Sequence, residues 1–140
     1  MIKFKEPRNV SYDKEAKELY DIINENSSTI FYKKPLKDIF IVSMCIGYYY
    51  KKRKKLKKAL PNINFTAFTQ EEKWLLYAIG LKELGKISID ENEYNMIFRI
   101  AEEYANYGIS ILYEIVREEI EFNSKFEEMI LQAYDEIFNK

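Results

Sequence analysis

The chain has 140 residues, of which 47% are hydrophobic and 32% charged, and its net charge is −1. This length and balance indicate one globular domain. The absence of histidine and the single cysteine, Cys45, exclude an intrachain disulfide, a Ser-His catalytic triad and the usual zinc ligand sets within one chain. The N-terminal stretch MIKFKEPRNV has no apolar signal segment, and no apolar run approaches the ~20 residues that span a bilayer. We therefore expect a cytoplasmic protein with no membrane contact.

The near-zero net charge hides an asymmetry between the two halves of the chain. Residues 1–60 contain 15 Lys/Arg and 7 Asp/Glu, a net charge of +8, whereas residues 61–140 contain 7 and 16, a net charge of −9. A chain divided in this way can offer a basic surface to an anion and an acidic surface to a second partner. Alternatively, the two halves neutralise each other across the fold. We treat residues 1–140 as a single domain with a basic N-terminal half and an acidic C-terminal half.

The first predicted helix begins at Ser11, since the apolar residues that follow, Ala16 to Ile23, repeat every three or four positions. A second helix is predicted to begin near Pro35, which suits a first-turn position. Its sequence, LKDIFIVSMCIGYYY, is apolar almost all round, so the central and most buried helix is predicted near 36–50. Within it we expect Cys45 to be a buried, inert thiol. Gly47 is expected either to let another backbone approach or to mark the helix end.

Three more helix starts follow in the acidic half. Thr69 with Glu72 forms a capping-box pattern for a helix that ends at Gly85. Asp90 is predicted to cap a long helix, with a break at residues 106–108 because Asn and Gly are weak helix formers. Ser124 with Glu127 is predicted to begin the last helix. Residues 86–90 could form a short edge strand, and residues 61–68 resemble a loop. The predicted fold is all-α, a compact domain of about five helices.

The densest charge lies directly after the central helix, where the sequence GYYYKKRKKLKK places seven cations in eight positions. We call residues 51–58 the basic segment; its cations are Lys51, Lys52, Arg53, Lys54, Lys55, Lys57 and Lys58. Phosphates would neutralise such a cluster, and lysine suits contact with a nucleic-acid backbone better than base readout. Tyr48, Tyr49 and Tyr50 could stack on exposed bases, or could end the buried helix with only their hydroxyls in water. A solvated loop and a docking surface for an acidic protein are the alternatives to polyanion binding.

Few residues remain that could perform catalysis. There is no phosphate-binding loop of the GxxxxGK[ST] type and no GxGxxG sequence. Neighbouring carboxylates such as Glu102 and Glu103, or Glu118 and Glu119, point about 100° apart on a helix, so neither pair converges on one ligand. We expect no cofactor and no metal site. A nuclease with carboxylate-bound metal is the third functional alternative, because distant carboxylates can converge in a fold.

Two stretches of this chain together resemble a known family. They are PLKDIFIVSMCIGYYYKKRKKL and IFRIAEEYANYGISILYEIV, and the resemblance covers roughly residues 35–115. They are similar to the fourth protein associated with Dnd systems, the gene clusters for DNA phosphorothioation, in which sulfur replaces a phosphate oxygen. The sequence departs from the family pattern at Tyr107, where that pattern has glycine. The resemblance provides no catalytic residues.

The resemblance implies a non-catalytic accessory role in DNA modification and restriction, and so in antiviral defence. The basic segment would then contact DNA or a larger complex. The expected partners are the DNA backbone and protein subunits of that complex, with a homo-oligomer as a further case. The competing hypothesis is a structural protein–protein interaction module, such as a homodimer, with no nucleic-acid contact.

Overall fold

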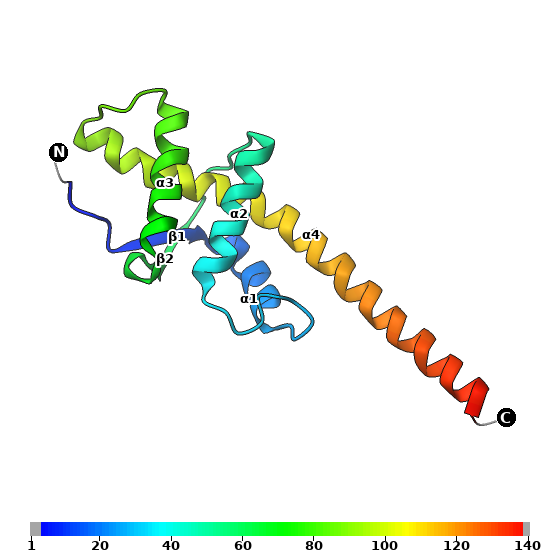
Figure 1. The fold of residues 1–140 in the computed structure, drawn as a ribbon. Coiled ribbons are helices and arrows are strands. Elements are labelled where there is room, and N and C mark those ends of the chain that lie inside the picture. Colours follow the sequence, from blue (N-terminus) through cyan, green and yellow to red (C-terminus); the bar gives the residue numbers. More distant parts are fainter. Residues whose placement is uncertain (1–3, 139–140) are drawn as a thin grey trace.

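The computed structural model describes residues 4–138, and within that range the chain forms four α-helices and a two-stranded sheet (Figure 1). In chain order the elements are β1 (Asn9–Asp13), α1 (Lys17–Glu25), α2 (Leu36–Tyr50), β2 (Ala59–Asn64), α3 (Gln70–Leu84) and α4 (Glu91–Phe138). Short 3-10 turns at Lys14–Ala16 and Phe65–Ala67 connect the strands to the helices that follow. The fold is thus mostly helical, and the prediction of an all-α domain of about five helices was wrong.

The small two-stranded sheet is the first difference between the structure and the predicted all-α fold. β1 pairs antiparallel with β2, so that Val10 lies opposite Ile63 and Tyr12 opposite Leu60, with a bulge between these pairs. Val10 and Tyr12 are both buried and alternate along the strand as β-sheet residues do. The helix predicted from Ser11 therefore begins only at Lys17, and the segment interpreted as a loop from residue 61 contains most of β2.

The central helix was predicted correctly as α2. Ile39, Phe40 and Met44 are all fully buried, whereas Ile46 is only partly buried. Cys45 lies on the exposed side of α2, so the prediction of a buried thiol was wrong. Apolar residues of α2 therefore lie on its solvent side as well as on the side that faces the core.

The main packing contact of the domain joins α2 to α4. Gly47 and Gly108 lie at the crossing, where an added Cβ on Gly47 would come 2.7 Å from the Tyr104 carbonyl carbon and one on Gly108 would come 2.7 Å from the Ser43 carbonyl carbon. Real side chains do not approach backbone this closely, so only glycine fits at either position. Gly47 thus confirms the first of its two predicted roles, close approach of another backbone.

The predicted break at residues 106–108 was wrong, since α4 runs without interruption from Glu91 to Phe138. Gly108 is a weak helix former, but tertiary packing against α2 outweighs its propensity cost of about 1 kcal/mol. The pair Ser124 and Glu127 likewise lies inside α4 and begins no new helix. One long helix therefore replaces two predicted ones.

The caps of α3 were predicted correctly. Thr69 and Glu72 form both hydrogen bonds of a capping box, and Gly85 ends the helix with φ of 74°. Asp90 and Glu93 make the equivalent pair of bonds at the start of α4. Residues 86–90 connect the two helices as a loop, not as the edge strand that their alternation indicated.

Candidate nucleic-acid interface

The basic segment leaves the C-terminal end of α2 and passes over the middle of α4 to reach β2 (Figure 1). All seven of its cationic side chains are exposed. At its first residue, Lys51 adopts the left-handed conformation, with φ of 57°, that usually requires glycine. The backbone N–H groups of Lys51 and Lys52 then donate to the carbonyls of Tyr48 and Gly47, which completes a Schellman-type helix end.

One end of the basic segment is held by a buried carboxylate. Asp13 is 1% exposed and accepts hydrogen bonds from the backbone nitrogens of Lys57 at 3.0 Å and Lys58 at 3.4 Å. Burial alone would raise the pKa of Asp13, but these bonds and a third from the Glu15 backbone outweigh it and lower the pKa. The Lys14 backbone nitrogen also donates to the Lys58 carbonyl at 2.8 Å. A charged anchor thus fixes the segment where it enters β2.

The middle of the segment is held by α4. The Asn106 side-chain nitrogen donates to the carbonyl oxygens of Lys54 at 3.1 Å and Lys55 at 3.3 Å. The Lys54 backbone nitrogen in turn donates to the Glu103 carbonyl at 3.0 Å. Asn106 is 8% exposed, and its side chain also helps to lower the pKa of the Asp13 carboxyl, so it acts on both anchors of the segment. The segment has no regular secondary structure over residues 52–56, yet specific hydrogen bonds hold its backbone on both sides.

The seven cations differ in their surroundings. Arg53 lies between Glu83 at 3.5 Å and Glu103 at 3.6 Å, and Lys57 pairs with Glu15 at 3.3 Å. The Lys51 ammonium lies 3.3 Å from the centre of the Tyr48 ring, and the Lys52 ammonium 5.7 Å from that of Tyr107. Within residues 4–138, none of these ion-pair or ring contacts involves the three remaining cations, Lys54, Lys55 and Lys58.

The three tyrosines before the segment also separate into two kinds. Tyr48 is half-buried and packs edge-on against Tyr104 with ring centres 5.6 Å apart. Its other contact is the Lys51 ammonium, so this ring is already used within the protein. Tyr49 and Tyr50 are 78% and 50% exposed and meet edge-on at 5.1 Å. Of the three predicted stacking residues, these two present ring surface to solvent.

Residues 1–60 and 61–140 are connected by ion pairs. Besides the pairs of Arg53, Lys37 contacts Glu72 at 2.6 Å and Lys73 contacts Glu6 at 3.1 Å. The pairs of Lys37 and Arg53 neutralise part of the charge asymmetry inside the fold, whereas the Lys73–Glu6 pair joins a cation of the acidic half to a carboxylate of the basic half. The basic segment remains the place where several cations are exposed together.

One half-buried carboxylate beside this region has an unusual pKa. Glu102 accepts a hydrogen bond from the Ser11 backbone nitrogen at 2.6 Å, at the bulge of β1. Burial raises the pKa of Glu102 to about 7, although that hydrogen bond and nearby Arg99 act to lower it. Its charge therefore changes near neutral pH. Its neighbour Glu103 faces Arg53, so the two adjacent carboxylates diverge as expected.

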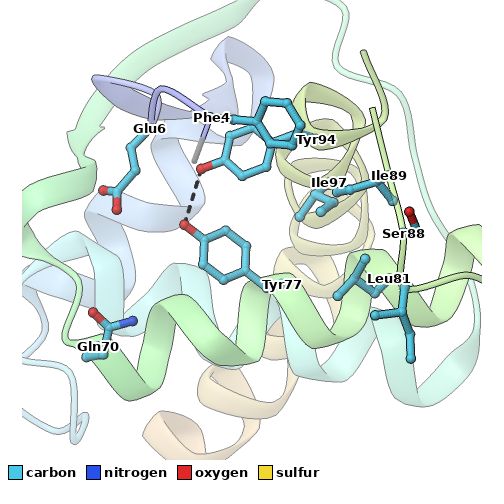
Figure 2. A pocket seen from close by; sticks show the side chains of 10 residues that line it. Phe4, Glu6, Gln70, Tyr77, Leu81, Ser88, Ile89, Tyr94 and Ile97 are labelled. Carbon is cyan, nitrogen blue, oxygen red and sulfur yellow. Dashed lines mark hydrogen bonds between the residues drawn. The ribbon is translucent and has the colours of Figure 1, made fainter. Parts of the chain in front are cut away.

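An apolar cleft of about 640 Å³ lies elsewhere, between the N-terminal arm, α3 and the start of α4 (Figure 2). Inside it the hydroxyls of Tyr77 and Tyr94 meet at 3.3 Å, and Phe4 packs on the Tyr94 ring at 5.1 Å. Burial and the paired hydroxyl raise the pKa of Tyr77. The hydroxyls of the two tyrosines thus pair with each other.

Sequence reasoning located the cations but missed the residues that position them. Asp13 lies 44 residues before the backbone nitrogen that it binds, and Asn106 lies 52 residues after the first carbonyl that it binds. The sequence around Asn106 was interpreted as a helix break and not as an anchor for the basic segment. Over residues 4–138 no group of three or more Asp, Glu or Cys side chains is placed to hold a metal ion, and no helix in that range is long and apolar enough to cross a membrane.

The fold and site define a small, mostly helical protein that presents a lysine-rich segment on an anchored backbone. Residues 9–139 match the family model of DNA sulphur modification system-associated protein 4. The chain therefore belongs to this family, which agrees with the resemblance found in the sequence and with an accessory role in such a system. No curated protein and no solved structure matches it.

Proposed function

We propose that this protein is a non-catalytic accessory subunit of a DNA sulphur modification system and contacts the DNA backbone through the basic segment. The observation that carries the proposal is the group formed by Lys54, Lys55 and Lys58, three exposed cations on a backbone held by Asp13 and Asn106. Family membership supplies the DNA-modification context. Such a role requires access to chromosomal DNA, so we place the protein in the cytoplasm.

The anchored backbone favours binding for a physical reason. Ordering a loop when a partner binds costs free energy, and a loop that is already held avoids most of this cost. Lysine ammonium groups act as point charges that neutralise phosphates and release condensed counterions. Such contacts position a protein on DNA without reading sequence. Tyr49 and Tyr50 add exposed rings for unpaired bases next to the same segment.

The alternative function is a protein–protein interaction module, such as a homodimer, in which the basic segment contacts an acidic protein surface. The carboxylate-metal nuclease is a weaker candidate, because the adjacent Glu102 and Glu103 have different partners and do not face a common ligand. Lysine dominance and the family's DNA-modification context favour the DNA backbone over an acidic protein as the target.

The experiment is a salt titration of duplex DNA binding by fluorescence anisotropy. Each neutralised phosphate contributes about −0.9 to the slope of log affinity against log salt, so three contacts predict a slope of about −2.7. The variant K54Q/K55Q/K58Q should lose most of this slope and bind all sequences more weakly. The control variant K5Q/K33Q/K34Q removes the same charge from exposed positions elsewhere and should keep the slope. If wild type does not bind DNA at low salt, the proposal is refuted.

A further inference from the structure

The C-terminal half of α4 projects away from the domain (Figure 1). Val116 is its last buried residue, and from residue 117 to residue 138 every side chain is exposed or only partly buried. In Figure 1 the orange and red part of α4 extends beyond all the other helices and strands. We call residues 118–138 the distal arm.

The distal arm carries an apolar stripe. Its members follow one another at steps of three or four along the helix, with one adjacent pair; they are Phe122, Phe126, Met129, Ile130, Ala133 and Ile137. At 100° per residue these six fall within an arc of about 100°, which is one helix face. The five large side chains among them are 51–71% exposed. Acidic side chains dominate the rest of the surface.

This stripe continues the face that α4 uses inside the domain. Ala101, Tyr104 and Leu112 are buried there, and steps of three or four residues lead from them to Phe122. Glu119 falls in the same line, and the neighbouring Ile120 is the last side chain of α4 that packs against the core. The helix thus has one apolar face along most of its length, of which only the first part is covered by this chain.

The exposed apolar area of the stripe is as large as the patches that often mark binding sites on monomeric proteins. The stripe and its edge contain three aromatic side chains, Phe122, Phe126 and Tyr134, each more than half exposed. At roughly 200 Å² for a whole aromatic side chain, these three alone expose about 350 Å². Met129, Ile130 and Ile137 add to this area, since each is more than half exposed. Monomers rarely expose apolar patches beyond a few hundred Å², and a stable complex needs about 800 Å² from each partner. The exposed stripe provides most of the area that one partner must contribute.

Charge decides between the candidate occupants. The distal arm has seven Asp/Glu and one lysine, a net charge of −6. Glu118 and Glu136 flank one edge of the stripe, and Glu127 flanks the other. Two copies of the arm would bring these acidic edges together, which opposes self-association. A surface with Lys or Arg along its rim is complementary.

The width of the stripe indicates the shape of the partner. A helix that pairs with a single other helix buries a narrow seam of two positions in seven. An arc of about 100° is broader and suits an amphipathic helix that lies in a groove between several elements. We propose that the distal arm docks into an apolar groove with a basic rim on another protein of the same DNA sulphur modification system. This inference is independent of DNA contact by the basic segment, and either can fail without the other.

Adjacent residues on the arm provide a matched pair of variants. Ile130 lies in the stripe, whereas Leu131 points about 100° further round the helix, on the far side from the centre of the stripe. Both are exposed, at 51% and 68%, so replacing either with glutamate removes similar apolar surface and adds the same charge. I130E and L131E should both fold with wild-type urea midpoints. Only I130E should weaken docking, by about tenfold or more.

The test measures binding of the full chain to each purified protein of the same sulphur modification system by calorimetry. One of them should bind, I130E should lose this affinity, L131E should keep it, and E118K/E136K should weaken it through the basic rim. Sedimentation equilibrium of the full chain alone should give a monomer. Three results overturn the proposal: no protein of the system binds, I130E and L131E lose affinity equally, or the chain forms a dimer that I130E dissociates. The last would assign the stripe to a second copy.

Discussion

Replacing Asn106 with alanine tests whether α4 holds the basic segment. The substitution removes the amide that donates to the carbonyls of Lys54 and Lys55 at 3.1 and 3.3 Å. Each lost hydrogen bond costs about 1 kcal/mol, and alanine regains about 0.5 kcal/mol of helix propensity. We therefore expect the free energy of unfolding to fall by about 1.5 kcal/mol. The same change should make the basic segment more mobile. Ordering even one residue again on DNA costs about 1 kcal/mol, so the Kd for DNA should rise about fivefold.

The stability effect is measured by urea unfolding, and the local effect by hydrogen exchange of the backbone amides in residues 52–58. The control is N123A, the same substitution at a partly buried asparagine further along α4, which has the same propensity gain. Exchange in the basic segment should accelerate in N106A and stay unchanged in N123A. If N106A matches N123A in unfolding free energy, in exchange and in DNA affinity, the reasoning about the anchor is wrong.

Three further changes test other parts of the account. G108A should lower the free energy of unfolding by about 3 kcal/mol, because its Cβ would overlap the Ser43 carbonyl, whereas S110A on the outer face of α4 should change it by no more than about 0.5 kcal/mol. Equal urea midpoints for the two variants would contradict close helix packing. The raised pKa of Glu102, about 7 in the folded state, means that wild-type stability should fall as pH rises from about 4.5 to 7, by up to about 3 kcal/mol. Urea midpoints of E102Q should not show this fall, and parallel pH profiles for the two proteins would refute the assignment. K51G should raise the thermal midpoint, because glycine relieves a left-handed backbone that costs lysine about 1 kcal/mol; an unchanged or lower midpoint would contradict this.

Local patterns in the sequence predicted what depends on neighbouring residues. The capping box at Thr69 and the left-handed Gly85 were both readable, because caps are made within four residues. The central position of α2 followed from its unbroken apolar run. The exposure of the basic segment agrees with its charge density.

Contacts between distant residues were not readable in the same way. The β1–β2 pair joins residues about 50 apart, so nothing local distinguished Asn9–Asp13 from a helix start. Gly108 was interpreted through propensity alone, whereas its role is to let α2 approach. Asp13 and Asn106 carry no signal in their own neighbourhoods that they position the lysines. The sequence therefore predicted the charged residues of the candidate site but not the residues that hold them in place.

The most direct test of the DNA-binding proposal is lysine labelling of the full chain with an amine-reactive reagent at low salt, with and without duplex DNA, followed by mass spectrometry. The account predicts that DNA protects Lys54, Lys55 and Lys58, and that Lys5 and Lys33, which are exposed elsewhere, stay equally reactive. Unchanged labelling of the basic segment at DNA concentrations that saturate binding would contradict it.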